Sequence, residues 1–297
     1  MSILHAIVLG ITQGFSEFLP ISSSGHLLLV PWLFGWHDFD GQPDLQRTFD
    51  VALHLGTLVG AVCYFRTDLL RLASAALRSL PFRRRVGSTT RATGDPAPPG
   101  LLAGGEDAQA RLVWLLLASA LPAAAIGAAF ESSFTSIAQA EWAIGALLIV
   151  FGLVLAWADG LGGLRPVERF GPRDALIMGL AQAVALAPGV SRSGVTITSG
   201  RAMGFGRDAA ARLAFLMSLP ITFGALVYKG SDLVLDPGLL DGLEGAFVAG
   251  VITSGVTGWL AVWGTLRFIR THTFRPFVIY RVVLGTAVIL LAVSPWR

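Results

Sequence analysis

The chain has 297 residues, of which 54% are hydrophobic and only 14% charged, and its mean hydropathy is +0.66. Soluble domains average about 25% charged residues, so this composition excludes a soluble enzyme and predicts an all-α polytopic membrane protein. The formal net charge of +3 is small and gives no nucleic-acid-binding surface. The single cysteine, Cys63, excludes a disulfide within the chain or a thiolate metal site. Because no Lys or Arg precedes Arg47, a cleavable signal peptide is not expected.

The apolar sequence at the N-terminus is interrupted by a polar turn. Residues 2–18 and 26–36 are apolar, but each is too short to cross a hydrocarbon core of about 30 Å comfortably. They are joined by the turn at residues 20–25, which contains a proline, three serines and a glycine. Irregular backbone at membrane depth is tolerated only where it is buried in protein or lines a cavity. The pattern therefore predicts a re-entrant helical hairpin.

Six longer apolar stretches are long enough to span a membrane. They are expected at residues 48–65, 111–130, 136–160, about 209–228, 243–266 and 277–294. Arginines cluster between them, at residues 66–106, 165–173, 201–207 and 267–275. The positive-inside rule makes these basic segments cytoplasmic. The first of them begins with a candidate interfacial helix and continues into a loop at about 80–106, rich in Pro, Gly, Ser and Thr, that we expect to be mobile.

The interrupted pattern at the N-terminus recurs 169 positions later. Gly179-Leu-Ala-Gln182 matches Gly10-Ile-Thr-Gln13, and Val190-Ser-Arg-Ser-Gly194 matches Ile21-Ser-Ser-Ser-Gly25. Short apolar stretches at residues 174–187 and 194–203 flank this second break. We therefore predict one integral membrane domain, residues 1–297, built as an inverted repeat of about 1–160 and about 170–297. Each half has one re-entrant hairpin plus three transmembrane helices, so the hairpins enter from opposite sides and their turns meet near the midplane.

The second break carries an arginine, Arg192, where the first carries Ser23. An arginine at the bilayer centre costs roughly 3 kcal/mol even on the lenient insertion scale, so it needs an acidic partner or an anionic ligand. Backbone N–H groups and hydroxyls at a helix start, together with a guanidinium, favour a phosphate group. One alternative is a structural ion pair between Arg192 and Glu17. Another is that Ser191, Ser193 and Thr196 only cap the helix.

The first break carries Glu17 and His26, which can form a general acid/base pair or part of a metal site. The alternative is that both are satisfied by backbone groups and by each other. Gln13 shares a helix face with Glu17 and can orient a phosphate or a metal-bound water. Three candidate nucleophiles, of which Ser23 is preferred, are Ser22, Ser23 and Ser24. Asp50 and His54, four residues apart, are expected to give indirect support at most.

Three segments resemble the bacitracin-resistance family of undecaprenyl-diphosphate phosphatases: residues 13–26, Phe49-Asp-Val-Ala-Leu-His-Leu-Gly56, and Pro188-Gly-Val-Ser-Arg-Ser-Gly-Val-Thr196. The resemblance continues through Arg201-Ala-Met-Gly204 and Phe277-Val-Ile-Tyr-Arg281. It implies an integral membrane enzyme with two re-entrant hairpins and a dependence on divalent cations.

The family's acidic motif falls on Gln13 and Glu17, and its serine–histidine turn on Ser22, Ser23 and His26. Its phosphate motif falls on Ser191, Arg192, Ser193 and Thr196. Ser24 stands where many members have threonine. Gln13 weakens any mechanism that needs two carboxylates on the metal.

The predicted reaction is hydrolysis of a polyprenyl diphosphate in the bacterial cytoplasmic membrane, at a site that faces outward. The catalytic residues are predicted to be Glu17, Ser23, His26 and Arg192, with either Ser23 or water as the nucleophile. The substrate-binding residues are predicted to be Gln13, Ser22, Ser24, Ser191, Ser193 and Thr196. Glu17 is expected to hold a divalent cation, Mg²⁺ or Ca²⁺. A homodimer is left open, and the alternative function is a polyprenyl-phosphate lipid transporter or flippase.

Overall fold

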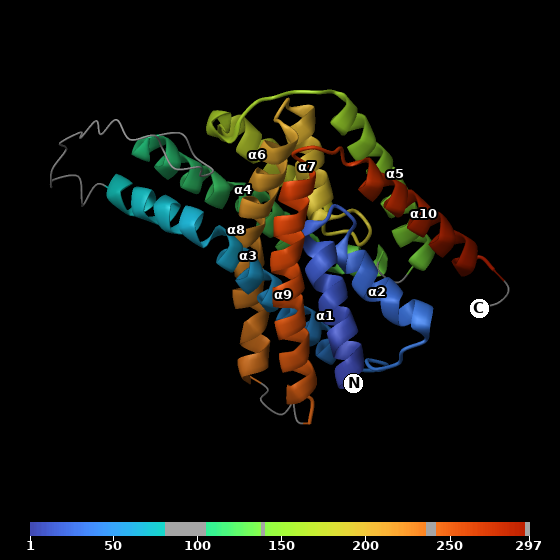
Figure 1. Ribbon diagram of the computed structural model, residues 1–297. Helices are drawn as coiled ribbons and strands as arrows, with labels where there is room; N and C mark the ends of the chain where they lie inside the picture. The colour runs from blue at the N-terminus through green and yellow to red at the C-terminus, as the bar shows by residue number, and fades with distance from the viewer. Residues whose placement is uncertain (81–104, 138–139, 236–241, 295–297) are drawn as a thin grey trace.

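The computed structural model describes residues 1–80, 105–137, 140–235 and 242–294, and these residues are almost entirely helical (Figure 1). The helices of the first half are α1 (Ile3–Phe18), α2 (Ser23–Phe34), α3 (Pro43–Ser79), α4 (Glu106–Ile137) and α5 (Glu141–Gly160). Those of the second half are α6 (Pro172–Val184), α7 (Arg192–Ala202), α8 (Arg207–Leu235), α9 (Glu244–Phe268) and α10 (Arg275–Ala292), preceded by the short 3₁₀ helix η2 (Val167–Arg169). Within the described part of the chain, no β-strand is longer than a single bridge between Arg165 and Phe205.

Six of these helices, α3, α4, α5, α8, α9 and α10, are long and apolar enough to cross a membrane, which confirms the six predicted spans. The first one differs from prediction, because α3 does not end near Arg66 but continues to Ser79. Residues 66–79 contain neither Gly nor Pro and are rich in Ala, Leu and Arg, which are strong helix formers. The expected interfacial helix is therefore a direct continuation of the span. The loop expected to be mobile lies almost entirely outside the described residues.

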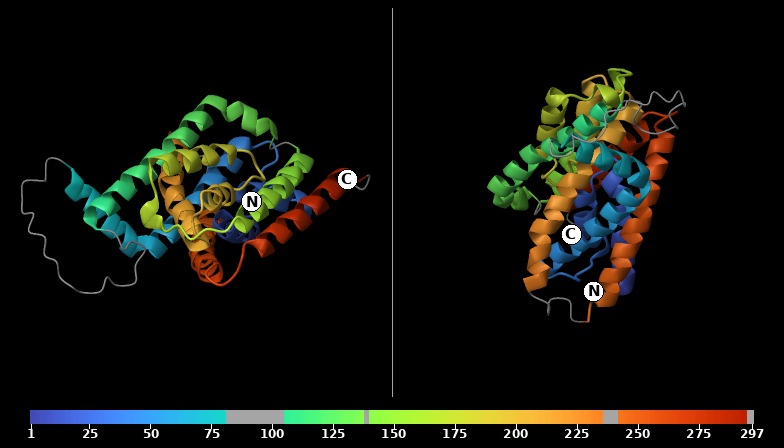
Figure 2. Two further views of the ribbon diagram at one scale, coloured as in Figure 1. Left: turned by 90° about the horizontal axis from the view of Figure 1, so that it is seen from above. Right: turned by 90° about the vertical axis from the view of Figure 1, so that its left-hand side faces the viewer.

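The two interrupted helix pairs approach the centre from opposite ends of the molecule (Figure 1). In that view α1 and α2 rise from the end that carries the N-terminus, and α6 and α7 descend from the other end. Seen from above, α6 and α7 lie between the ends of α3 and α4 on one side and the paired helices α5 and α10 on the other (Figure 2). The breaks in both pairs are thus brought into the interior.

Small residues allow the interrupted helices to lie close to their neighbours. A Cβ atom added at Gly10 would be 2.0 Å from Thr253 Oγ1 of α9, and one at Gly14 would be 1.8 Å from Thr257 Oγ1. On the other half, a Cβ atom at Gly179 of α6 would be 2.5 Å from the carbonyl oxygen of Ser119 in α4. Close backbone approach of this kind is how membrane helices gain van der Waals contact. The glycines at equivalent positions of the two breaks therefore dock α1 on α9 and α6 on α4.

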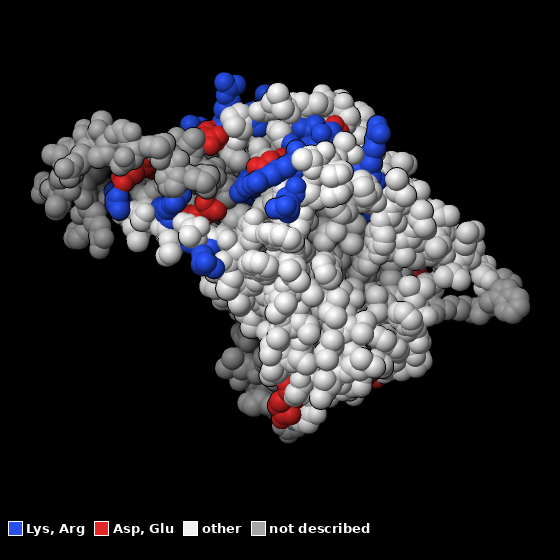
Figure 3. Space-filling view, viewed as in Figure 1, with Lys and Arg blue, Asp and Glu red and all other residues white. Residues whose placement is uncertain are grey.

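Charged residues are divided between the two ends of the molecule. Arginine side chains gather at the end from which α6 and α7 descend, while the opposite end shows acidic side chains (Figure 3). The basic end includes the buried carboxylate of Asp159, which pairs with buried Arg201 and half-buried Arg207, and Arg207 Nε donates to Asp159 Oδ1 at 2.6 Å. The acidic end includes Asp38, which accepts a 2.6 Å hydrogen bond from His5 Nδ1. The molecule therefore has a distinct basic end and acidic end along the direction of its spans.

Candidate active site

The two helix breaks have the same local geometry. Ser22 is the N-cap of α2 and Ser191 is the N-cap of α7, and their φ angles are 80° and 78°. They are the only non-glycine residues with positive φ in the described part of the chain. Each side-chain oxygen accepts a hydrogen bond from the backbone three residues on, at Gly25 and Gly194. Strained backbone of this type costs about 1–3 kcal/mol and persists only where the surroundings fix it. The two breaks, which lie 169 residues apart in the sequence, therefore adopt the same unusual turn.

The breaks contact each other directly. The backbone N–H of Gly189 donates to Ser22 Oγ at 3.1 Å, and Ser193 Oγ donates to the carbonyl oxygen of Leu19 at 3.0 Å. A Cβ atom added at Gly25 would lie only 3.3 Å from the backbone nitrogen of Gly189. The two turns therefore contact each other, as predicted, through hydrogen bonds and close backbone approach.

Glu17 and Arg192 form the centre of this junction. The Arg192 guanidinium donates to Glu17 Oε1 and, at 2.7 Å, to Thr222 Oγ1 of α8. The other carboxylate oxygen, Oε2, accepts hydrogen bonds from Ser23 Oγ at 2.6 Å and Gln13 Nε2 at 3.0 Å. The ion pair considered from the sequence is thus present, and a serine hydroxyl lies on the same carboxylate. A hydroxyl that donates to a carboxylate is the arrangement that activates a nucleophile.

His54 of α3 completes the surroundings of Glu17. Its Nε2 atom is 3.6 Å from Glu17 Oε2, and its Nδ1 atom is 2.7 Å from the carbonyl oxygen of Asp50. A carbonyl oxygen can only accept, so Nδ1 carries a hydrogen and Nε2 is the nitrogen left to exchange a proton with Glu17. From the sequence we expect His54 to support the site only indirectly. In the structure it lies next to the Glu17 carboxylate.

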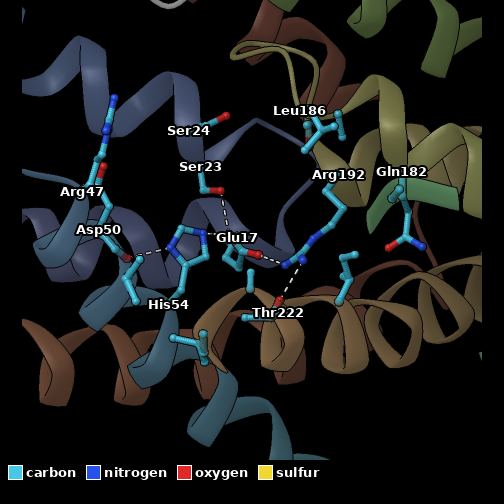
Figure 4. A pocket seen from close by; sticks show the side chains of 17 residues that line it. Glu17, Ser23, Ser24, Arg47, Asp50, His54, Gln182, Leu186, Arg192 and Thr222 are labelled. Carbon is cyan, nitrogen blue, oxygen red and sulfur yellow. Dashed lines mark hydrogen bonds and ion pairs between the residues drawn. The ribbon is translucent and has the colours of Figure 1, made fainter. Parts of the chain in front are cut away.

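A cavity of about 370 Å³ opens beside these groups (Figure 4). Its polar side is formed by α1–α3 and the start of α7, through Glu17, Ser23, Ser24, Arg47, Asp50, His54, Ser191 and Arg192. Its apolar side is formed by α4, the second break and α8, through Ala123, Ala185, Leu186, Ile221, Ala225 and Leu226. One wall can therefore bind a charged group while the other contacts hydrocarbon.

His26 does not line this cavity, although the sequence grouped it with Glu17 and Ser23. Its ring is buried, Nδ1 is 2.7 Å from the carbonyl oxygen of Ser22, and Nε2 is 2.6 Å from the Tyr280 hydroxyl. The ring also stacks on Tyr280 at a centroid distance of 5.6 Å. Both nitrogens are therefore occupied, and the imidazole fixes the carbonyl of the strained Ser22.

The remaining candidates divide between the cavity and the turns. Ser24 and Ser191 line the cavity, whereas Ser22 and Ser193 make the contacts between the two breaks. Thr196 donates to the carbonyl oxygen of Arg192 at 2.7 Å, as a hydroxyl within a helix commonly does. These residues therefore shape the turns, and only part of the set faces the open space.

The sequence matches the family model described as "Bacitracin resistance protein BacA" over residues 6–287. The chain belongs to this family. It is 43% identical over 291 residues to a protein of Pelobacter propionicus, with 97% of each chain covered, and 44% identical over 295 residues to one of Desulforudis audaxviator, with 98% of each covered. A protein of Nocardioides sp. is 39% identical over 292 residues, with 98% of this chain and 97% of its own length covered. All three relatives carry the name undecaprenyl-diphosphatase.

Two further residues of this BacA-family site were missed from the sequence. Thr222 orients the free end of Arg192, but a threonine within an apolar span gives no distinctive signal. Arg281 is fully buried in α10 and donates to backbone carbonyls of both breaks. In the sequence it stands out only as the last residue of the segment 277–281 that resembles the family, yet an arginine inside an apolar span is itself a sign of function.

The protein groups around the cavity offer few ligands for a metal ion. Among the described residues, no three or more His, Cys, Asp or Glu side chains are grouped so as to hold a metal ion. Two carboxylates, Glu17 and Asp50, line the cavity. Gln13 is buried behind Glu17 and does not line the cavity, and its side-chain oxygen has no hydrogen-bond partner within the described part of the chain. Mg²⁺ is commonly bound by one or two carboxylates plus substrate phosphate oxygens, whereas Ca²⁺ takes six to eight oxygens. This BacA-family site therefore fits Mg²⁺ better than Ca²⁺.

Proposed function

We propose that this protein is a membrane phosphatase that hydrolyses undecaprenyl diphosphate to undecaprenyl phosphate and inorganic phosphate. The observation that carries the proposal is the convergence of Ser23 and Arg192 on Glu17 at the wall of one cavity. A nucleophile, its base and a phosphate-binding guanidinium are thus within contact of one another. The relatives named undecaprenyl-diphosphatase cover nearly the whole chain. Removal of the terminal phosphate returns the lipid carrier to cell-wall synthesis and accounts for the family's link to bacitracin resistance.

Substrate binding begins with an exchange of partners at Arg192. In the resting protein its guanidinium is held by Glu17 and Thr222. A terminal phosphate in the cavity offers Arg192 a bidentate, charge-assisted interaction, which is about twice as strong as a neutral hydrogen bond. The backbone N–H groups of the first turn of α7, which follows Ser191, point toward the N-terminal end of the helix and would add to the binding of the phosphate. Ser24 and Ser191 supply further hydroxyls from the cavity wall.

The chemistry follows from the bond between Ser23 and Glu17. Glu17 Oε2 accepts the hydroxyl proton at an Oγ–Oε2 distance of 2.6 Å, and Ser23 Oγ forms a bond to the terminal phosphorus. The bridging P–O bond breaks, and its electron pair leaves with undecaprenyl phosphate. Water then attacks the phosphorus of the phosphoserine, with Glu17 again taking the proton. The P–Oγ bond breaks, its electron pair returns to Ser23 Oγ, which is protonated again, and inorganic phosphate is released. Arg192 stabilises the charge that develops on the phosphoryl oxygens.

His54 holds the proton that Glu17 receives. Its Nδ1–H donates to the backbone carbonyl oxygen of Asp50, so Nε2 faces the Glu17 carboxylate at 3.6 Å. Transfer from Glu17 to His54 restores the carboxylate for the second step. We therefore assign to His54 the acid/base role that the sequence gave to His26, and we assign to His26 the positioning of Ser22 through its carbonyl.

A divalent cation, best Mg²⁺, would be held by Glu17 and the free oxygen of Gln13 once Arg192 has turned to the phosphate. It would neutralise charge on the diphosphate. The chain's own residues supply the base, the nucleophile and the guanidinium. In this scheme Gln13 keeps two roles, since its amide N–H also donates to Glu17.

The arrangement in the membrane follows the charge distribution. The arginine-rich end is cytoplasmic by the positive-inside rule, so α1–α2 is a re-entrant hairpin from the outside and α6–α7 one from the cytoplasm, as an inverted repeat requires. Support comes from the docking of α1 on α9 and of α6 on α4, the equivalent helices of the two halves. The cavity is lined by the N-terminal part of α3 and the C-terminal part of α8, both toward the acidic end. The site of this inner-membrane protein thus faces outward.

A lipid transporter does not need a serine hydroxyl that donates a hydrogen bond to a carboxylate, so the Ser23–Glu17 pair favours the phosphatase over the transporter. The test is release of inorganic phosphate from undecaprenyl diphosphate by purified protein, with and without EDTA. Wild type is compared with Glu17→Gln and with the matched change Glu244→Gln at the start of α9, away from the cavity. We expect metal-dependent turnover that Glu17→Gln abolishes and Glu244→Gln retains. A folded wild type without turnover would refute the phosphatase.

A further inference from the structure

Arg281 is a charged residue in the interior of the protein that has no acidic partner among the residues the structure describes. Its side chain is 0% exposed and lies within α10, one of the six spans. All of its hydrogen bonds in the structure go to backbone carbonyl oxygens. An arginine is costly at membrane depth, so its presence there calls for a specific role. Its role must lie in the carbonyl groups that it joins.

Those carbonyl groups belong to three separate parts of the chain. In the first break, Arg281 Nη1 donates to Pro20 at 3.1 Å. In the second break, Nη2 donates to Gly189 at 2.9 Å and Val190 at 3.0 Å. The Nε atom donates to Leu148 of α5 at 3.0 Å. The planar guanidinium has five N–H donors in a rigid fork, so it can hold several acceptors in a fixed relation to one another. One side chain thus ties both breaks to α5.

The carbonyls that Arg281 holds lie next to the strained serines. Pro20 is two residues before Ser22, and Val190 directly precedes Ser191, the two residues with positive φ. Arg281 also lies beneath the start of α7, since a Cβ atom added at Gly194 would be 2.9 Å from Nη1. Carbonyl groups freed by an irregular turn need donors when water is excluded. Arg281 supplies these donors to both turns.

Tyr280 provides a second link from α10 to the first break. Its hydroxyl is 2.6 Å from His26 Nε2, and His26 Nδ1 binds the carbonyl of Ser22. Consecutive residues of α10 therefore fix Pro20 and, through His26, Ser22. Glu17 precedes this turn and Ser23 follows it, so any shift of the turn changes the distance between the base and the nucleophile.

We propose that Arg281 is a positioning residue that locks the two helix breaks in register and thereby sets the geometry of the Glu17–Arg192 site. It does not line the cavity and acts through the backbone of the turns. The inference rests on the proposed function for its activity measurement. A second measurement, hydrogen exchange at the breaks, is independent of that function.

The test uses Arg281→Gln and Arg281→Lys in the full chain, with Arg201→Lys as the matched control. Arg201 is another buried arginine that donates to backbone carbonyls, at Phe205 and Asp159, but at the basic end of the molecule. Arg281→Lys keeps the charge and loses the fork, so it carries the test if Arg281→Gln fails to fold. Hydrogen exchange by mass spectrometry is followed in peptides that cover residues 19–26 and 187–195.

We expect both Arg281 variants to exchange faster in both peptides, by about 10-fold, because each break opens more easily. We expect kcat to fall by roughly 100-fold with KM changed by less than about threefold, because misplaced catalytic groups slow the chemical step. Arg201→Lys should leave exchange in both peptides and kcat near wild type. If wild type releases no phosphate, the proposed function fails and the exchange result still decides the role of Arg281. Wild-type exchange in either break, or wild-type kcat in a variant with faster exchange, would overturn the proposal.

Discussion

Replacement of Arg192 tests the phosphate clamp quantitatively. In the resting protein the guanidinium makes two hydrogen bonds, one to Glu17 and one to Thr222 at 2.7 Å, and in the complex both donors are available to the phosphate. A hydrogen bond to a charged group contributes about 1.5–3 kcal/mol. Loss of two such bonds in Arg192→Ala therefore raises the barrier by about 3–6 kcal/mol, which lowers kcat/KM by roughly 10² to 10⁴.

Two milder changes give the graded controls. Arg192→Lys retains the charge without the bidentate geometry, so we expect about one of the two bonds to survive and a loss of roughly 10- to 100-fold. Thr222→Val removes a neutral acceptor that holds Arg192 only in the resting protein and leaves both donors for the phosphate, so we expect kcat/KM to stay within about fivefold of wild type.

The assay is release of inorganic phosphate from undecaprenyl diphosphate in detergent, over a range of substrate concentrations for each folded variant. We expect a fixed order, with wild type and Thr222→Val fastest, then Arg192→Lys and finally Arg192→Ala. It is refuted if Arg192→Ala stays within about threefold of wild type, or if Arg192→Lys is no better than Arg192→Ala.

Three further outcomes are expected. Ser23→Ala should lower kcat by at least about 100-fold because it removes the proposed nucleophile, whereas Ser24→Ala, which removes only a binding hydroxyl of the same cavity wall, should raise KM and keep kcat within about threefold; equal losses of kcat would count against Ser23. Gln13→Glu adds a carboxylate in place of the amide, so half-maximal activity should need less Mg²⁺, as a cation titration would measure; an unchanged requirement would exclude Gln13 from the cation site. Ser191→Ala should lower the melting temperature more than Ser191→Gly, since glycine tolerates positive φ and is a fair N-cap; the reverse order in thermal unfolding would show that strain is unimportant there.

Much of the architecture could be predicted from the sequence because it depends on local composition. Long uncharged stretches gave the six spans, and Pro20 and Gly25 located the first break. The pairing of Glu17 with Arg192 was foreseen as an alternative, because two charges at membrane depth favour each other. The family resemblance, through its long motifs, supplied the substrate.

The parts that could not be predicted depend on contacts between distant segments. His26 faces Tyr280, which lies 254 residues further along the chain, and no local pattern tells which way a histidine at a turn will point. His54 reaches Glu17 because α3 and α1 are both docked on α9 through glycines such as Gly14 and Gly56. Arg281 could have been singled out by its charge alone, but its partners are backbone carbonyls, which carry no sequence signal.

The mutual neutralisation of Glu17 and Arg192 has a consequence for the release of products. An anion that takes both donors of Arg192 must displace the Glu17 carboxylate as well as Thr222, so the resting site favours ligands with high charge density. Once the phosphoserine is hydrolysed, the terminal phosphate that Arg192 held is inorganic phosphate, which carries less charge than the diphosphate did and competes with Glu17 less well. When the Glu17 carboxylate returns to the guanidinium, it displaces this product. Because Glu17 competes with anions for Arg192, the ion pair limits product inhibition and weakens the binding of other anions from the medium.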